Sequence, residues 1–317
     1  MAILLRESDV KKLATMQMAL EAIEEAFRLQ GENKTDNAPR RRCRVERGLL
    51  QVMSASLPTL GVAGLKSYTT IDGKTRFHVL LYSGEDGRLL AVIEAELLGQ
   101  LRTGAASGVA TKYMARTDAS HLGVFGTGFQ ARAQLAAVCA VRPIRTIVAY
   151  GRNPERRDKF CREMSQTLDV EVEPAANPEQ AAQDMDIIIT ATTSKEPVFN
   201  GEWLAKGVHI NAVGSNHLGR RELDVETVRR SACVVVDSLE QSMLESGDLA
   251  SAAEGGAFYW EDARELGAVV TGDFPGREEA SEITLFKSNG IALEDVAFAG
   301  RIYRAAVKAG VGESLPL

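Results

Sequence analysis

The stretch HLGVFGTGFQA, residues 121–131, decides the fold of this chain. Its first five residues are mostly apolar and predict a short strand, and the alanine-rich segment from Ala131 to Val141 predicts a helix. Between them, Gly126 permits a tight turn and Gly128 lets a pyrophosphate approach the backbone, while small Ala131 allows close packing of helix on strand. The stretch predicts a dinucleotide-binding turn, with an ordinary structural turn as the alternative.

Strands and helices alternate after this stretch, as they do in βαβ units. We predict strands near 121–125, 145–150, 170–173, 185–191, 208–213 and 232–236, and helices near 129–141, 154–167, 177–184 and 222–230. This order predicts an α/β fold with a doubly wound parallel sheet of the Rossmann type.

The first part of the chain has a different pattern, typical of an antiparallel sheet. A strand is expected at Ile3–Leu5, and a helix capped by Ser8 is expected to run as far as Phe27. Further strands are expected at 63–69, 77–82 and 89–95, with turns at Gly73 and 85–87, followed by a helix over 96–113. A last helix over 291–309 fits either part of the chain, because periodicity does not decide its partner.

Length and composition limit the class of protein. A chain of 317 residues is too long for one small core, so two domains are expected. A formal charge of −6 without a basic tract argues against nucleic-acid binding, and no apolar run is long enough for a membrane span. The four cysteines and four histidines have no metal-ligand spacing, which predicts no metal and a reduced, cytoplasmic protein.

The end of the second predicted strand bears on the choice of cofactor. NAD-binding sites usually have an acidic residue there for the ribose 2′-hydroxyl. This chain has Gly151-Arg152-Asn153 instead, and a guanidinium matches a 2′-phosphate. We therefore expect NADP(H); NAD(H) stays possible if Arg152 is only solvated.

Two later strand ends are candidates for contact with cofactor or substrate, because ligands of such sheets lie beyond the carboxyl ends of the strands. One is Thr190–Ser194 and the other is Ala212–Gly219. Asn216 and His217 are candidates for substrate contact, although Gly, Ser and Asn also favour ordinary turns.

Cationic residues in the first part of the chain are candidates for binding an anionic substrate. Lys66 interrupts an apolar strand, so it lies either at an exposed edge or in a site where burial would lower its pKa. Arg102 lies in a helix of small residues, with the same two alternatives. The Arg40–Arg44 cluster is most simply a solvated basic loop, yet any member can clamp a carboxylate.

Together these pieces resemble the ornithine cyclodeaminase/μ-crystallin family over nearly the whole chain. The motifs that carry the resemblance are Pro39-Arg40-Arg41, Gly64-Leu65-Lys66, Leu101–Ala106, Gly126–Ala131, Val213–Asn216, Arg221–Asp224 and Ser288–Asp295. The resemblance implies a substrate and dimerisation domain over 1–118, completed by a C-terminal helix over 290–317. It also implies an inserted Rossmann domain over 119–289 and a homodimer.

The resemblance further implies roles for single residues. Arg41 matches the arginine of the family's P-x-R motif and, with Lys66 and Arg102, would bind the substrate carboxylate. Lys66 is a candidate proton donor or acceptor, and a water held near Asn216 and His217 is the alternative proton source. The residues expected to bind the cofactor are Thr103, Gly126, Thr127, Gly128, Phe129, Gln130, Ala131, Arg152, Asn153, Thr190, Ala191, Thr192, Val213, Gly214 and Ser215.

One departure from the family's pattern selects among its activities. Cyclodeaminases have a basic aspartate where this chain has Asn216, and an amide takes no proton at neutral pH. We therefore expect an NAD(P)H-dependent oxidoreductase that reduces the C=N bond of an α-imino acid or cyclic ketimine carboxylate, reversible as an amino-acid dehydrogenase. A redox-neutral cyclodeaminase and a non-catalytic, crystallin-like protein that binds NADPH and a small ligand are the alternatives.

Overall fold

The computed structural model describes residues 1–316, and the chain divides into two compact units. Unit 1 consists of Met1–Ala105 and the C-terminal segment from Gly290, and unit 2 is Ala106–Asn289. The division falls inside helix α3 (Glu96–Met114), 13 residues before the predicted end of the first domain at 118. Among the residues described, no helix combines the length and apolar character needed to cross a membrane.

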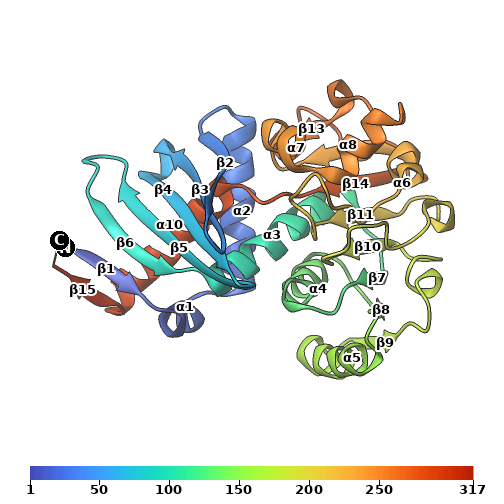
Figure 1. Ribbon diagram of the computed structural model, residues 1–317, viewed down its shortest axis with the longest axis horizontal. Helices are drawn as coiled ribbons and strands as arrows, with labels where there is room; N and C mark the ends of the chain where they lie inside the picture. Colours follow the sequence, from blue (N-terminus) through green and yellow to red (C-terminus); the bar gives the residue numbers. More distant parts are fainter. Residues whose placement is uncertain (317) are drawn as a thin grey trace. The chain divides into compact units, whose positions relative to one another are not determined.

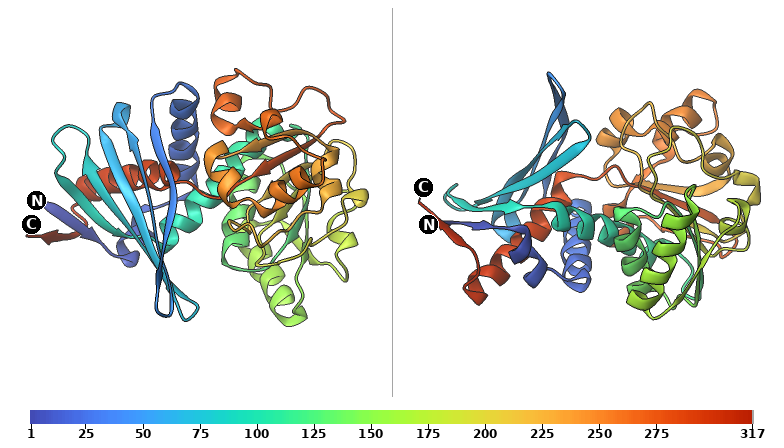
Figure 2. Two further views of the ribbon diagram at one scale, coloured as in Figure 1. Left: turned by 45° about the horizontal axis from the view of Figure 1, so that its top comes forward. Right: turned by 60° about the horizontal axis from the view of Figure 1, so that its bottom comes forward.

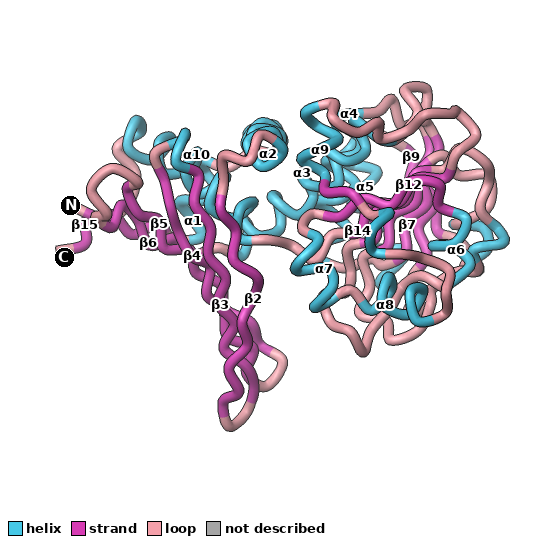
Figure 3. The backbone as a smooth tube through the Cα atoms, turned by 90° about the horizontal axis from the view of Figure 1, so that it is seen from above, coloured by secondary structure: helices cyan, strands magenta, loops and turns pink. Residues whose placement is uncertain are grey.

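Unit 1 is built on one sheet whose order is β15-β1-β6-β5-β4-β3-β2. Its strands are β1 (Ala2–Leu5), β2 (Asp36–Val45), β3 (Gly48–Leu57), β4 (Val62–Ile71), β5 (Lys74–Ser83), β6 (Leu89–Glu94) and β15 (Glu313–Leu315). Neighbours from β2 to β6 are antiparallel, as predicted, and Gly73 makes the β4–β5 turn with φ +76°. Figure 3 shows the far ends of these hairpins extending beyond the helices of the unit.

Helix α10 (Ala292–Ala309) packs on β3 and β4 and against α2 (Met16–Gly31). In Figure 2 it runs as a red ribbon along the sheet of unit 1. The prediction of one helix from Ser8 to Phe27 is wrong, because α1 (Glu7–Leu13) ends before an extended Ala14. Thr15 then caps α2 by accepting a hydrogen bond from the Met18 amide.

The basic cluster Arg40–Arg44 is not the loop that the sequence predicted. It lies in β2, which pairs with the apolar stretch of β3 through an irregular register between Ala38 and Arg41. Strand pairing therefore gives each arginine of the cluster a defined face of the sheet.

Unit 2 confirms the predicted Rossmann-type α/β fold, with a parallel sheet of order β13-β12-β14-β11-β10-β7-β8-β9. Its strands are β7 (His121–Phe125), β8 (Thr146–Tyr150), β9 (Glu171–Pro174), β10 (Ile187–Thr190), β11 (His209–Ala212), β12 (Ser231–Val236), β13 (Arg264–Glu265) and β14 (Ile283–Lys287). Strand β7 lies between β8 and β10, so the sheet reverses its winding direction there (Figure 1).

Helices cover both faces of this sheet (Figure 3). They are α4 (Phe129–Val141), α5 (Pro154–Leu168), α6 (Val225–Arg230), α7 (Leu239–Glu245), α8 (Gly247–Glu254) and α9 (Leu266–Thr271). Ile187 and Ile189 of β10 pack in one core with α4 and α5, and Ile188 packs in the other with α6 and α8. This alternation is why such central strands read as continuous apolar runs.

The helix predicted over 177–184 is wrong, since the structure has only a single 3-10 turn, Glu179–Ala181, in that segment. Side-chain hydrogen bonds compete with a longer helix: Asn177 accepts from the Gln180 amide at 3.0 Å, and Gln180 accepts from the Ala176 amide at 2.8 Å. The elements from α7 to β14 were not predicted.

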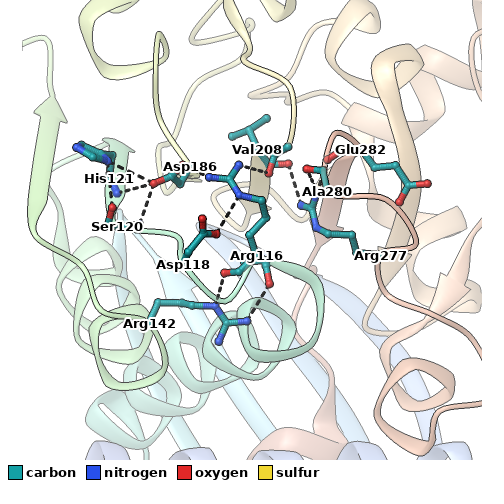
Figure 4. A network of polar contacts seen from close by, with 12 residues as sticks. Arg116, Asp118, Ser120, His121, Arg142, Asp186, Val208, Arg277, Ala280 and Glu282 are labelled. Atoms are coloured by element: carbon teal, nitrogen blue, oxygen red, sulfur yellow. Dashed lines mark hydrogen bonds and ion pairs between the residues drawn. The ribbon is translucent and has the colours of Figure 1, made fainter.

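A polar network ties together the amino ends of the strands of unit 2 (Figure 4). Asp186, just before β10, accepts hydrogen bonds from Arg116 and from the amides of Ser120 and His121 at 2.5, 2.8 and 2.9 Å. Arg142 and Arg277 donate to main-chain carbonyls at the end of α3, including that of Met114. This network lies at the opposite ends of the strands from the carboxyl ends, where ligands of such sheets bind.

Candidate functional site

The turn from β7 into α4 has the backbone that a pyrophosphate site needs. Gly126 has φ +103°, and a Cβ there would lie 2.4 Å from the Ala191 carbonyl oxygen, so only glycine fits. Gly128 is the N-cap of α4 and supplies no side-chain acceptor, and a Cβ there would meet nothing within 4 Å. The N-cap residue of α4 thus offers the helix no side-chain acceptor, and the amino end of a helix suits an anionic ligand.

A pocket of about 540 Å³ opens at this turn, where the sheet of unit 2 reverses direction. The residues predicted for the cofactor that line it are Gly126, Thr127, Gly128, Arg152, Asn153, Ala191 and Thr192. They come from the ends of β7, β8 and β10. Tyr150, Arg156 and Val198 also line the pocket and were missed, because they lie outside the glycine motif.

The other residues predicted for the cofactor lie elsewhere. Phe129 and Gln130 begin α4, and Ala131 is fully buried in the core. Thr103 belongs to unit 1, where its hydroxyl donates to the Gly99 carbonyl at 2.7 Å. Thr190 is the last residue of β10, and Val213, Gly214 and Ser215 follow β11; none of the four lines the pocket.

Two arginines stand at the β8 end of the pocket. Arg152 and Arg156 are both exposed, and Asn153 caps α5 by accepting from the Arg156 amide at 2.9 Å. No carboxylate lines the pocket among the residues that the structure describes. The region where a ribose 2′-substituent is expected is therefore cationic.

Buried Glu222 joins the loops that follow β10 and β11. One of its oxygens accepts from the Thr192 amide and hydroxyl at 2.6 and 2.7 Å. The other accepts from the Thr190 hydroxyl at 2.8 Å and the Gly214 amide at 2.7 Å. Burial raises the pKa of Glu222, whereas nearby Lys287 and the donated hydrogen bonds favour its charged form.

A second layer of charge supports Glu222. Asp248 accepts from the amides of Glu222 and Leu223 at 2.6 and 2.9 Å. Fully buried Lys287 lies 3.0 Å from the same carboxylate and donates to the Ser215 carbonyl at 2.7 Å. Main-chain groups on both sides of the 214–222 loop are thus bound by buried charges.

Unit 1 contains the three cations of the carboxylate-binding prediction, Arg41, Lys66 and Arg102. Lys66 and Arg102 are buried, and their side chains meet at Asp295: Lys66 Nζ donates to Asp295 Oδ1 at 2.8 Å and Arg102 Nε donates to the same oxygen at 3.0 Å. Arg102 also pairs with Glu294 at 2.5 Å. The alternative that Lys66 and Arg102 are solvated is therefore wrong.

The arginine of β2 that is buried in unit 1 is Arg40, whereas Arg41 is exposed. The register of β2 is irregular between Ala38 and Arg41, so side chains need not alternate strictly between the two faces there. Arg40 donates to the Gly290 carbonyl at 2.8 Å, at the entry to α10. The role of Arg41 in the carboxylate site stays a prediction, and we call the buried set Arg40, Lys66, Arg102, Glu294 and Asp295 the cationic cluster.

The charge state of Lys66 follows from its surroundings. Burial lowers its pKa to about 8, Asp295 opposes this shift, and Arg102 and Arg40 add to it. The ammonium also lies 5.1 Å from the centre of the Phe77 ring. A lysine with this pKa can both donate and accept a proton near neutral pH.

Asn216 and His217 lie in unit 2, in the loop after β11. Asn216 is half-buried and His217 is exposed, and His217 Nδ1 accepts from the Gly219 amide at 3.0 Å. This contact fits the turn interpretation of His217. The structure finds no group of three or more metal-ligand side chains within residues 1–316.

Comparison with known proteins gives the family. The model of the ornithine cyclodeaminase/mu-crystallin family matches residues 2–310. The chain belongs to this family. It is 37% identical to an alanine dehydrogenase of Archaeoglobus fulgidus, over 99% of this chain and 98% of that protein.

Two solved structures are also similar. One is the Delta(1)-pyrroline-2-carboxylate reductase of Thermococcus litoralis in complex with NADH and L-proline, with 39% identity, a TM-score of 0.95 and coverage of 99% of this chain and 100% of that one. The other is an archaeal alanine dehydrogenase dimer with bound NAD, with 35% identity, a TM-score of 0.94 and coverage of 100% and 99%. The predicted family membership is confirmed.

Proposed function

We propose that the protein is an NAD(P)H-dependent oxidoreductase that reduces the C=N bond of an α-imino acid or cyclic ketimine carboxylate. The names of its relatives, a pyrroline-2-carboxylate reductase and alanine dehydrogenases, support this class. In the reverse direction the same site oxidises an amino acid. Asn216, in place of an acidic base, disfavours redox-neutral deamination.

The observation that carries the proposal is the excess charge of the cationic cluster. Within the described chain, the cluster sets Arg40, Lys66 and Arg102 against Glu294 and Asp295, so three cations face two carboxylates. The cluster thus contains one more cation than carboxylate. A buried excess charge is costly unless it is paired, and a substrate carboxylate supplies the pair.

The residues of the cationic cluster have different roles in the proposed reaction. Arg40 and Arg102 bind and orient the substrate carboxylate, since guanidinium groups match carboxylate geometry. When bound, the dinucleotide supplies a hydride for the imine carbon. Lys66 Nζ gives a proton to the imine nitrogen, which completes the reduction of C=N to CH–NH and leaves the lysine neutral until it is reprotonated from solvent.

The cofactor pocket of unit 2 favours NADP(H). Arg152 and Arg156 stand where the ribose 2′-substituent is expected, and the described lining of the pocket has no carboxylate to repel a phosphate. NAD(H) binding also fits the pocket, and the related structures bind NADH and NAD. The proposed assembly is a homodimer, by analogy with the alanine dehydrogenase dimer.

Oxidation of NADPH and NADH against a panel of imines tests the proposal. The panel contains pyruvate, oxaloacetate and glyoxylate, each with ammonia, and the cyclic pyrroline-2- and piperideine-2-carboxylates. Turnover with any of these establishes an imine reductase and identifies its substrate. Release of ammonia from ornithine without net change in the cofactor would instead establish a cyclodeaminase, and cofactor binding without turnover in either assay would indicate a non-catalytic binding protein.

A further inference from the structure

Asp295 occupies a special place in unit 1, in the first turns of α10. The segment before the helix is fastened to β2, because Arg40 donates to the Gly290 carbonyl and Asn37 accepts from the Leu293 amide at 3.0 Å. Asp295 is buried in the first turns of this helix, and the N-terminal end of a helix is a favourable place for a negative charge. The carboxylate is therefore fixed in position before any ligand binds.

A single atom of Asp295 serves both catalytic cations. Its Oδ1 accepts from Lys66 Nζ and from Arg102 Nε, so it sets the separation between the ammonium and the guanidinium. Its Oδ2 is buried and has no hydrogen-bond partner among the described residues. The hydrogen bonds that the Asp295 carboxylate accepts therefore come from the side chains of Lys66 and Arg102 rather than from main-chain amides.

Some of the groups around Lys66 favour its charged form, and others disfavour it. Arg102 from α3 and Arg40 from β2 disfavour a third cation, as does burial. The rings of Phe77 on β5 and Tyr68 on β4 lie 5.1 and 5.9 Å from the ammonium and offer weaker stabilisation. Asp295 is the carboxylate in direct contact with the ammonium, while neighbouring Glu294 pairs with Arg102 instead.

We propose that Asp295 is a positioning residue for imine reduction: its Oδ1 fixes Lys66 beside Arg102 and keeps the lysine protonated at neutral pH. This inference rests on the proposed function, in which Lys66 donates the proton. It adds that Asp295, on the C-terminal helix α10, sets the pH range in which the enzyme works, although Asp295 is not one of the cations that bind the substrate carboxylate.

The test is the pH dependence of kcat/KM for imine reduction in four proteins. In the wild type, activity falls as pH rises through about 8, where Lys66 loses its proton. In Asp295→Asn this falling limb moves to lower pH by about one unit or more, because an opposite charge at this range shifts a pKa by that much. Glu294→Gln, the matched control, removes the neighbouring carboxylate and leaves the midpoint in place. Lys66→Arg abolishes the limb.

The outcomes separate this inference from the proposed function. A limb near 8 that persists in Lys66→Arg shows that Lys66 is not the proton donor, and both ideas fail. A limb that disappears in Lys66→Arg but stays unmoved in Asp295→Asn overturns the role of Asp295 alone. Equal shifts in Asp295→Asn and Glu294→Gln also overturn it, since they indicate a general effect of removing buried charge.

Two further measurements cover a variant with weak turnover or a poor fold. Asp295→Glu keeps the charge and is expected to restore the limb near that of the wild type. The ¹³C chemical shift of the Lys66 Cε, identified by its absence from the spectrum of Lys66→Arg, reports the titration without activity. An unchanged Lys66 midpoint in Asp295→Asn by this measurement would contradict the proposal.

Discussion

Each unit buries a cluster of charged side chains, and the two clusters differ in the sign of their excess charge. In unit 1, the described residues place three cations around two carboxylates. In unit 2, Glu222 and Asp248 face the single lysine Lys287, and main-chain amides supply their other donors. Main-chain donors complete the cluster of unit 2, whereas the cluster of unit 1 consists of side chains with more cations than carboxylates.

The contrast between the two clusters separates two roles of a buried charge. A carboxylate that accepts from several amides holds loops together, because the amides would otherwise be buried without partners. A cluster of side chains with unequal charges is poorly compensated by itself and gains from an incoming ion. Asp186, at the amino ends of the strands, belongs to the first kind, since it accepts from two amides and from Arg116 (Figure 4).

The largest effect is expected when the cationic cluster loses the buried Arg40. Arg40→Ala should lower kcat/KM for imine reduction by roughly 100-fold to 1,000-fold, because truncating one partner of a buried charged contact costs about 3–4 kcal/mol. Steady-state kinetics with the identified imine measures this loss. Titration with NADPH should show that the pocket of unit 2 still binds its cofactor.

Arg41→Ala is the matched control on the same strand. Arg41 is exposed, so its removal should change kcat/KM by less than about twofold. If Arg41→Ala caused the larger loss, the exposed face of β2 would carry the site and the contrast between the two clusters would fail.

The second-largest effect is expected at Glu222, in the buried cluster of unit 2 that joins the loops after β10 and β11. Glu222→Gln replaces an acceptor oxygen by an NH₂ group, which meets the amide of Thr192 or of Gly214 whichever way the side chain is turned. A buried unsatisfied donor costs about 1–3 kcal/mol, so the free energy of unfolding should fall by that amount. Thr192 lines the cofactor pocket, so the Kd for NADPH should rise as well.

Chemical denaturation and cofactor titration measure the two effects of Glu222→Gln. Glu196→Gln is the control, because Glu196 is 76% exposed and pairs with Arg221 at the surface. Exposed ion pairs contribute little, so this variant should differ from the wild type by less than about 0.5 kcal/mol. Equal losses in both variants would mean that the contacts of Glu222 are not special.

The sequence predicted the parallel sheet and the cofactor turn well, because local signals determine both. Strand β7 and helix α4 have the predicted bounds, since the glycines between them permit one arrangement of strand, turn and helix. The weak elements from α7 to β14 were missed because they depend on tertiary packing that no local periodicity reports.

The site of unit 1 was predicted only in part. Lys66 and Arg102 were identified by their unusual places in apolar segments, but the face of β2 was not. The sequence did not predict that Arg40–Arg44 lie in a strand, so the burial of Arg40 and the exposure of Arg41 were not foreseen. The motifs around Glu222 and Asp295 were noticed, yet only the fold reveals which groups they touch.

A third prediction concerns Asp186, at the amino ends of the strands of unit 2. It separates a carboxylate that stabilises the fold from one that supports ligand binding. Asp186→Asn should lower the free energy of unfolding by about 1–2 kcal/mol, because three donors lose a charged acceptor. Both kcat/KM and the Kd for NADPH should stay at wild-type values, since the cofactor pocket lies at the other ends of the strands. A rise in the Kd for NADPH would show that the two ends of the sheet are coupled.

The pH dependence of stability checks the same residue. Burial tends to raise the pKa of Asp186, but the amides of Ser120 and His121 and the Arg116 guanidinium outweigh it and lower the pKa below its usual value. A lowered carboxyl pKa stabilises the fold above the unfolded pKa, and this contribution is lost as pH falls through the folded value. The difference between wild type and Asp186→Asn should therefore shrink below about pH 4. A constant difference would show that charge is not the cause.

The smallest effect is expected at the exposed rim of the cofactor pocket, where charge is neither buried nor balanced. Arg152→Ala should lower kcat/KM with NADPH about fivefold to tenfold relative to NADH, because a charge-assisted contact in solvent contributes about 1 kcal/mol. Arg156→Ala should act in the same direction, and the double variant should favour NADH. Kinetics with both cofactors measure the ratio, and Arg162→Ala on the outer part of α5 serves as the control, since Arg162 does not line the pocket. A ratio that none of these variants changes would mean that solvated arginines do not select the cofactor here, and that surplus charge acts as a binding signal only when it is buried, as in unit 1.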